Sequence, residues 1–309
     1  MTKIEWAEET INPFPGCTKV SEGCDNCYAA RQANRFKGGM KYGGLVENGE
    51  WTGRTRFWPG DIDQITKWRK PKFVFVNSMG DLFHPGNTFE QLDYLLCRML
   101  LAPQHTFLLL TKRPARMAEY FNGLRNNVIG HYDRLFFQSI YPRIHGKMIE
   151  YRKGTPFKNI YLGVTAENQQ RANERIPILL QITAAVRFVS VEPMLEFVQI
   201  RDWLYQDLIQ WVICGGESGP GARPVHPRWA RSLRNQCADI SFFFKQWGSW
   251  IPGDQCGQSV DPYAEGMPEW SVKKGNFHRW DSWLGSFKVG KKKAGRVLDG
   301  RTWDQYPKP

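Results

Sequence analysis

The sequence has no hydrophobic run long enough to cross a lipid bilayer. Apolar stretches such as FVFV (73–76) and FLLL (107–110) cover a few residues, whereas a membrane-spanning helix needs about 20. The first residues, MTKIEWAEETINPF, contain no apolar segment of the kind that secretory signal peptides carry. We therefore expect a cytoplasmic protein.

The sequence also lacks an even set of cysteines from which a disulfide framework could be built. It contains seven cysteines, and three of them, Cys17, Cys24 and Cys27, fall within a short stretch. An odd and clustered set without a secretion signal is more typical of metal or redox chemistry than of disulfides. There is no second Cys-x2-Cys pair, so paired motifs do not encode a closed four-thiolate site.

Internal repeats and long low-complexity tracts are absent too, and what remains is an alternation of apolar runs with helical patterns. The apolar runs lie at 73–81, 106–114, 159–168, 186–193, 211–219 and 241–248. Such continuous runs are typical of parallel strands that are covered by helices. With a possible first strand before Cys17, about six or seven βα units predict an α/β fold with a partial TIM-type barrel. A doubly wound open sheet is the main alternative.

The expected barrel covers residues 1–250, and residues 251–309 are expected to form a basic, aromatic C-terminal extension packed on it. Residues 122–158 interrupt the alternation with a polar insertion that contains tyrosine and arginine. Long insertions between regular elements are commonly functional. We expect this one to be a lid or a binding excursion.

Polar residues follow the apolar runs, where the carboxyl ends of the strands are expected. They are Cys17, Ser78, Asp81, Thr111, Lys112, Arg113, Thr165, Glu167, Asn168, Glu192, Glu217, Ser218, Lys245 and Gln246. Ligands of parallel α/β folds bind at that edge of the sheet. A strand end that simply meets water is polar as well, but a series along the whole chain favours a binding site.

The three clustered cysteines could hold an iron–sulfur cluster or zinc. Thiolates ligate both, and a Cys-x2-Cys pair brings two sulfurs to one metal centre. Zinc would need a fourth ligand, for which His84 and Cys256 are available. A cubane cluster on three thiolates would keep one iron open to a small molecule. Of the remaining cysteines, those expected to pack in the core are Cys97, Cys214 and Cys237, with Cys214 and Cys256 as secondary candidates for hydrogen-atom donors.

Seven motifs together resemble a known family. They are GCTKVSEGCDNCYA, NSMGDLF, LLTKRP, GVTAENQ, VSVEP, CGGESG and the ending GKKKAGRVLDGRTWDQYP. Over residues 10–306 the chain is similar to a phage-associated, three-cysteine family related to radical S-adenosylmethionine enzymes. The resemblance implies a partial TIM barrel, a 4Fe-4S cluster on Cys17, Cys24 and Cys27, and S-adenosylmethionine as cofactor or cosubstrate. Some phage enzymes of this type resemble isomerases in thymidine hypermodification, which rearrange an amino acid attached to the thymine methyl carbon.

The candidate cofactor-binding residues are Tyr28, Ser78, Asp81, Lys112, Arg113, Thr165, Glu167 and Glu217. The resemblance implies Tyr28, Ser78, Asp81 and, through the segment GGESG, Glu217, whereas the others are selected by their charge or by their position at strand ends. Tyr28 would offer adenine a stacking surface, and Ser78 and Asp81 would meet the methionine amine. The chain departs from the commonest cysteine spacing of radical S-adenosylmethionine enzymes, because six and then two residues separate its cysteines instead of three and two.

Charged strand-end residues suit the remaining parts of such a cofactor. Lys112 or Arg113 would pair with a carboxylate, and Glu167 with Asn168 would hold ribose hydroxyls. Further along the chain, Glu192 and Glu217 are candidates for positioning a substrate amine or for proton transfer.

The charge balance favours a polyanionic partner. The formal net charge is +12, and residues 270–309 carry an excess of lysine and arginine over aspartate. Aromatic rings interleave with basic residues there and in 51–61, and such surfaces hold phosphates and stack bases. We expect the protein to bind nucleic acid, DNA in particular, and to receive electrons from a donor such as flavodoxin or ferredoxin. If the chain is phage-encoded, we expect it in the cytoplasm of the host. The alternatives are a zinc-stabilised, non-enzymatic nucleic-acid-binding protein and a radical enzyme acting on a protein or a small metabolite.

Overall fold

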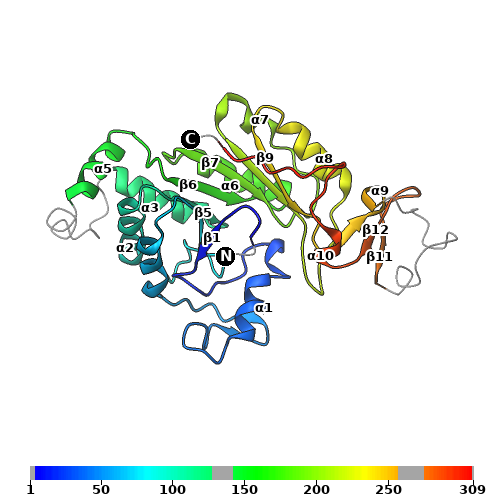
Figure 1. Ribbon diagram of the computed structural model, residues 1–309, viewed down its shortest axis with the longest axis horizontal. Helices are drawn as coiled ribbons and strands as arrows, with labels where there is room; N and C mark the ends of the chain where they lie inside the picture. Colours follow the sequence, from blue (N-terminus) through cyan, green and yellow to red (C-terminus); the bar gives the residue numbers. More distant parts are fainter. Residues whose placement is uncertain (1–3, 127–141, 257–274, 308–309) are drawn as a thin grey trace.

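A curled, parallel, seven-stranded sheet forms the centre of the computed structural model, which describes residues 4–126, 142–256 and 275–307 (Figure 1). Its strands are β1 (Glu9–Ile11), β4 (Phe73–Val76), β5 (Thr106–Thr111), β6 (Ile160–Thr165), β7 (Val186–Val191), β8 (Trp211–Gly215) and β9 (Ser241–Gln246). Each of the six apolar runs contains one strand, and the possible first strand before Cys17 is present as well. The predicted α/β fold with a partial barrel is confirmed at this level.

The strand order decides between the two topologies that the sequence permits. Within the sheet the strands follow one another in chain order, β1-β4-β5-β6-β7-β8-β9, and every neighbouring pair is parallel. A doubly wound sheet would reverse direction at a switch point. Because this sheet winds in one direction and curls, it is a half-barrel, and all its strands end at the same rim.

Helices connect the strands and cover the outer face of the sheet. The main ones are α2 (Phe89–Leu101), α3 (Pro114–Asn126), α5 (Pro142–Arg152), α6 (Gln169–Leu180) and α8 (Pro227–Gln236). Local sequence determines where they begin. Thr88 and Gln91 form a capping box at α2, and the Asn168 side chain accepts from the Arg171 amide at the start of α6. In Figure 1, α1 (Tyr28–Arg35) lies below the sheet, whereas α8 lies above it.

Short elements complete these connections. They are the 3-10 helices η1 (Glu22–Cys24), η2 (Pro59–Lys67) and η3 (Tyr205–Asp207), the helix α7 (Arg201–Leu204), and the hairpin of β2 (Val46–Glu47) with β3 (Glu50–Trp51). The predicted polar insertion at 122–158 includes the end of α3 and all of α5, and its central part, 127–141, lies outside the described residues. Among the helices that the structure describes, none combines the length and the apolar character of a membrane span.

The inner face of the half-barrel is filled by large apolar side chains. Phe75, Leu108, Phe188, Trp211 and neighbouring residues form one buried cluster together with Trp6, which comes from the segment before β1. The Trp6 ring lies 4.5 Å from the Phe75 ring and 6.1 Å from the Trp211 ring, centroid to centroid. These rings close the lower part of the barrel, because side chains of alternate strand positions point inward.

The C-terminal residues build a small second sheet and then return to the large one. β10 (Trp250–Pro252), β11 (Phe277–Arg279) and β12 (Gly285–Lys288) pair antiparallel, flanked by α9 (Gly253–Cys256) and α10 (Lys291–Ala294). The last described residues then run along β9, where the Phe244 amide donates to the Trp303 carbonyl at 2.9 Å. The free edge of β9 is thereby covered.

Candidate functional site

A cavity of about 210 Å³ opens at the rim, where the parallel strands end. Its walls include most of the residues that sequence analysis selected: Cys17, Cys24, Cys27, Tyr28, Ser78, Asp81, Thr111, Lys112, Arg113, Thr165, Glu192, Glu217, Ser218 and Lys245. Trp6, Phe75 and Leu110 provide apolar wall below them. The strand-end series is thus brought together at one site, as the partial barrel predicts.

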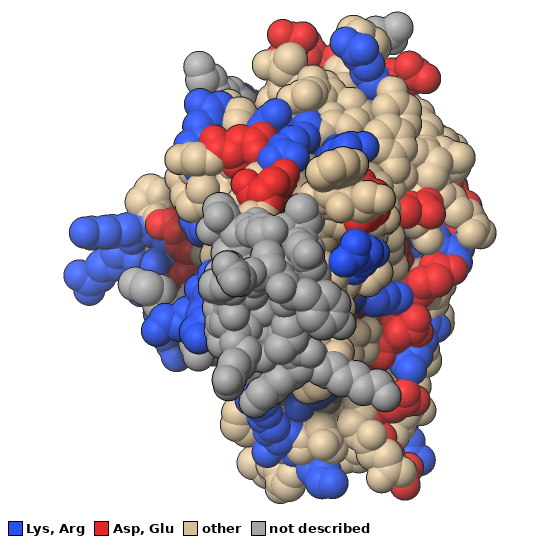
Figure 2. Space-filling view, turned by 90° about the vertical axis from the view of Figure 1, so that its right-hand side faces the viewer, with Lys and Arg blue, Asp and Glu red and all other residues tan. Residues whose placement is uncertain are grey.

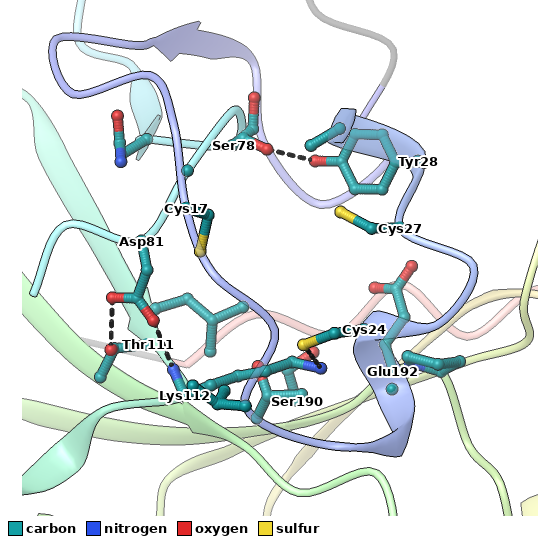
Figure 3. A pocket seen from close by; sticks show the side chains of 18 of the residues that line it. Cys17, Cys24, Cys27, Tyr28, Ser78, Asp81, Thr111, Lys112, Ser190 and Glu192 are labelled. Atoms are coloured by element: carbon teal, nitrogen blue, oxygen red, sulfur yellow. Dashed lines mark hydrogen bonds between the residues drawn. The ribbon is translucent and has the colours of Figure 1, made fainter. Parts of the chain in front are cut away.

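The three clustered cysteines face this cavity. Figure 3 shows their sulfur atoms directed into a common space from three sides. Cys24 ends η1, and Cys27 occupies the N-cap position of α1. The turns between them are short, with the Cys24 amide donating to Ser21 and the Cys27 amide donating to Cys24. All three thiols are free and half-buried.

A close backbone contact fixes the cysteine loop to the segment after β4. Gly16 and Gly80 form a parallel bridge. A Cβ on Gly80 would lie 2.4 Å from the carbonyl oxygen of Phe14 and 2.6 Å from that of Gly16. Gly16 itself has a φ of +105°, in a region that strongly favours glycine. Glycine at both positions allows Cys17 to approach the end of β4.

Two cations lie beside the cysteine sulfurs. Arg113 Nη1 is 3.5 Å from Cys17 Sγ. Lys112 Nζ is 3.7 Å from Cys24 Sγ, as Figure 3 shows. Burial, reinforced by Asp81, raises the pKa of Cys17 to about 11 although Arg113 opposes the change. Burial would raise the pKa of Cys24 too, but the charge of Lys112 and hydrogen bonds at Ser21 outweigh it, so that this pKa is lowered.

Asp81 organises the segment around Cys17. Its carboxylate accepts from Thr111 Oγ1 at 2.7 Å and from the Lys112 amide at 3.0 Å (Figure 3). It also accepts from Arg113 Nη1 at 3.0 Å. Arg113 in turn donates to Thr18 in the cysteine loop. Asp81 therefore lines the cavity, but both of its carboxylate oxygens already accept hydrogen bonds from protein groups.

Tyr28 and Ser78, which were expected at the cofactor, lie against each other. The Tyr28 hydroxyl donates to the Ser78 carbonyl at 2.8 Å, whereas the Ser78 hydroxyl donates to Asn12. The Tyr28 ring lines the cavity and is half-exposed. Its position suits a stacking surface, since one end of the ring is anchored and the face is accessible.

Glu167 is fully buried and is not part of the cavity wall. Its carboxylate pairs with Arg175 at 2.8 Å and with Lys112 at 3.2 Å, and it accepts from the Ser21 hydroxyl. Burial works against its charge, but the two cations prevail and lower the pKa of Glu167. Glu167 therefore links β6 to the cysteine loop. Asn168, its expected partner at a ribose, caps α6 instead.

Glu217 forms a second link between the rim and the cysteine loop. It pairs with Arg223 at 2.7 Å and accepts from Asn26 Nδ2 at 2.9 Å. Asn26 also donates to the carbonyl of Gly221. Glu217 lines the cavity, but both of its oxygens have donors from the protein.

Trp6 and Ser190 are among the wall residues that sequence reasoning missed. Trp6 and Ser190 are almost fully buried, and Trp6 Nε1 and Ser190 Oγ have no hydrogen-bond partner among the described residues. Ser190 could have been found from the alternation along β7, because it lies on the same face as Phe188 and Glu192. Nothing in the pattern before β1 singles out Trp6.

Comparison with known proteins identifies the family of the chain. Residues 1–307 match the family described as "Protein of unknown function (DUF5131)". The chain belongs to this family. Neither a curated protein nor a solved structure matches it.

The donor set in this DUF5131 chain fits an iron–sulfur cluster. Three free thiols face one cavity with cations next to two of them, and hydrogen bonds to sulfur tune such clusters. No group of three or more His, Cys, Asp or Glu side chains in the described parts of the chain is arranged around a single metal ion. Thiolates of a cluster bind different iron atoms, so a cluster does not require that arrangement.

The ligands that could complete a zinc site are placed as follows. The Nε2 atom of His84 lies 3.2 Å from Thr18 Oγ1, and its Nδ1 atom accepts a hydrogen bond from the Gly86 amide. The side chain of Cys256 lies outside the described part of the chain. Cys97, Cys214 and Cys237 are buried, as predicted for core residues, and burial raises their pKa values, that of Cys97 to about 12.

Only some of the aromatic residues that were expected on the basic surface are exposed. Phe287 is buried, and Trp280 packs between His226 and His278. Trp283, between β11 and β12, is 84% exposed. Figure 2 shows basic and acidic side chains interspersed on this side of the molecule. Trp270 lies outside the described residues.

Proposed function

We propose that this DUF5131 chain is a radical S-adenosylmethionine enzyme that holds a 4Fe-4S cluster on Cys17, Cys24 and Cys27 and modifies a nucleobase. The observation that carries the proposal is the convergence of three free thiols from one loop on the cavity at the rim of a parallel half-barrel. The family resemblance narrows the proposal to the isomerisation of an amino acid substituent on thymine in phage DNA.

When bound, such a cluster would supply one electron to S-adenosylmethionine and so give access to radical chemistry. The chain's own residues hold and shield the site. Lys112 and Arg113 favour the thiolate forms of Cys24 and Cys17, because each places a positive charge beside a sulfur. The apolar wall of Trp6, Phe75 and Leu110 limits the access of water from below.

The remaining cavity residues would bind the organic part of the cofactor. Tyr28 would stack on adenine, and Lys112 or Arg113 would attract the methionine carboxylate across the cavity. Thr165 and Ser78 line the same wall and would add hydrogen bonds. Asp81, Glu167 and Glu217 would act mainly by holding these groups and the cysteine loop, since their oxygens have donors from the protein.

The proposed partners follow from charge and chemistry. The net charge of +12 and the exposed Trp283 support association with DNA, because phosphates attract basic residues and bases stack on aromatic rings. A target base would have to leave the helical stack in order to enter a cavity inside the barrel rim. Reduction would need a donor such as flavodoxin or ferredoxin in the cytoplasm of the host cell.

Anaerobic reconstitution of the full chain tests the proposal. We expect a brown protein with about four iron and four sulfide per chain, and 5′-deoxyadenosine after addition of reductant, S-adenosylmethionine and phage-type DNA. Cys24→Ala is expected to lose the nucleoside product and most of the iron. Cys97→Ala is the matched control, because Cys97 is buried in α2 away from the cavity wall.

A colourless protein that contains one zinc per chain would contradict the cluster and favour the zinc-stabilised alternative. Full retention of 5′-deoxyadenosine formation in Cys24→Ala would show that the cysteine assignment is wrong. If 5′-deoxyadenosine forms without any altered nucleoside in the DNA, the substrate would be a protein or a small metabolite instead.

A further inference from the structure

One ion pair in the cavity wall differs from all the other charged groups there. Lys245 Nζ lies 2.5 Å from Glu192 Oε1, and the two side chains come from β9 and from the residue after β7. Gly215 of β8 lies between them, and a Cβ at that position would come within 3.4 Å of both side chains. The pair thus spans the intervening strand, with both side chains beside Gly215.

This pair retains hydrogen-bonding capacity, whereas the other carboxylates of the rim do not. Asp81 and Glu217 each accept from several protein donors. Within the parts of the chain that the structure describes, the side chains of Glu192 and Lys245 bond only to each other. One carboxylate oxygen and two ammonium hydrogens are therefore available to a ligand at adjacent positions.

Two buried polar atoms in the wall of the same cavity point to a ligand independently. Ser190 is 1% exposed and lies two positions before Glu192 on the same face of β7, and Trp6 is 2% exposed. Neither Ser190 Oγ nor Trp6 Nε1 has a partner among the described residues, and both residues line the cavity. Buried polar groups in native proteins are normally hydrogen-bonded, so unpaired ones require an explanation.

A neutral group with a donor and an acceptor side by side matches these atoms. Glu192 would accept from an N–H, and Lys245 would donate to a neighbouring carbonyl or ring nitrogen. Trp6, Phe75 and Leu110 supply the apolar wall against which a planar ring can lie. The hydrogen-bonding edge of a nucleobase has this pattern, and enzymes that extrude a base read that edge by hydrogen bonds while apolar side chains hold the ring.

We infer that Glu192, Lys245 and Ser190 form the subsite that reads the hydrogen-bonding edge of an extruded nucleobase. The inference rests on the proposed function, since it names the part of the substrate that this end of the cavity receives. It does not depend on the cluster, because reading a base edge requires only these side chains. Binding and 5′-deoxyadenosine formation can therefore fail separately.

Binding of a short, fluorescent single strand tests the inference. The strand carries one thymine flanked by abasic positions, and its matched counterpart carries N3-methylthymine, in which the edge donor is blocked. We expect the methylated strand to bind the reconstituted protein about tenfold more weakly. The double variant Glu192→Lys/Lys245→Glu keeps an ion pair but exchanges donor and acceptor, and it is expected to abolish this preference.

Thermal unfolding of the double variant shows whether it folds, and Ser190→Ala provides a second variant that removes a single hydroxyl. Ser190→Ala is expected to weaken thymine binding about fivefold. Equal binding of the two strands, or unchanged thymine binding in Ser190→Ala together with an unchanged preference in a folded double variant, would overturn the inference. Displacement of the thymine strand by adenosine would assign this end to the cofactor, and displacement by free glycine would assign it to a zwitterion; either result would also overturn it.

Discussion

The Ser21 hydroxyl donates a hydrogen bond to the buried carboxylate of Glu167, although 146 residues separate them in the chain. Lys112 and Arg175 neutralise the same carboxylate. This contact ties the loop that carries the three cysteines to the end of β6. The position of the cysteine loop thus depends on charges that belong to the sheet.

Replacement of Glu167 by alanine is expected to destabilise the protein and to loosen the cysteine loop. Removing one partner of a buried pair leaves uncompensated charges, here on Arg175 and Lys112, which costs about 3–5 kcal/mol. Urea unfolding measures the loss of stability. The iron content per chain after reconstitution measures whether the cysteine loop still binds the cluster. Glu174→Gln is the control, because Glu174 pairs with Arg171 at the surface and such pairs contribute about 0–1 kcal/mol. Equal effects of the two variants would contradict the role given to Glu167.

Gly80→Ala is expected to destabilise the fold by about 1–3 kcal/mol, because the added Cβ would meet two backbone carbonyl oxygens at 2.4 and 2.6 Å. Backbone atoms of the Gly16–Gly80 bridge cannot rotate away as a side chain could. Gly146→Ala in α5 is the matched substitution in open space, and it is expected to stabilise by about 0.5–1 kcal/mol. Chemical denaturation of both variants checks whether their unfolding free energies change in opposite directions. A stable Gly80→Ala would show that the contact is not required.

Asp299 gives the stability a dependence on acid pH. Hydrogen bonds from Arg231 and then from Arg234 outweigh partial burial and lower the pKa of Asp299 to about 2. A lowered carboxyl pKa contributes stability above the unfolded-state pKa, near 3.8, and loses it as the pH falls towards 2. Because the pairs are partly exposed, we expect Asp299→Asn to cost about 1 kcal/mol at pH 6 and almost nothing at pH 2.

Unfolding free energies from urea titrations over this pH range test that expectation. Asparagine suits position 299, where φ is +52°, since it tolerates the left-handed region well. Asp239→Asn at an exposed position is the control. A stability difference for Asp299→Asn that does not change with pH would exclude the ion pairs as its cause.

Trp283→Ala is expected to weaken binding of single-stranded DNA without changing stability. The ring is 84% exposed, so its removal costs little packing, whereas stacking of a base on it contributes about 1–3 kcal/mol. Fluorescence anisotropy at several salt concentrations measures the effect. Tyr205→Ala removes an aromatic ring that is 55% exposed on η3 and is expected to leave affinity unchanged. Equal losses in the two variants would argue against a specific role of Trp283.

Local patterns in the sequence predicted the strands and their common edge, whereas the strand order that excludes a doubly wound sheet came from the structure. Continuous apolar runs predicted parallel strands, and each predicted run contains one. Polar residues at their ends predicted a common site, and the cavity at the rim contains most of them. These predictions succeed because periodicity and strand ends are properties of neighbouring residues.

The roles of individual rim residues depended on the tertiary structure. Glu167 and Glu192 both follow a strand, yet Glu167 is enclosed by Lys112 and Arg175, whereas Glu192 lines the cavity with one oxygen that no residue in the described ranges contacts by a hydrogen bond. The difference arises from the curl of the sheet and from the loop that folds over it. Glu192 pairs with Lys245, which is 53 residues away in the chain, because β7 and β9 lie on either side of β8. Burial and charge partners are set by strand register and by chain segments distant in sequence, and no local pattern encodes them.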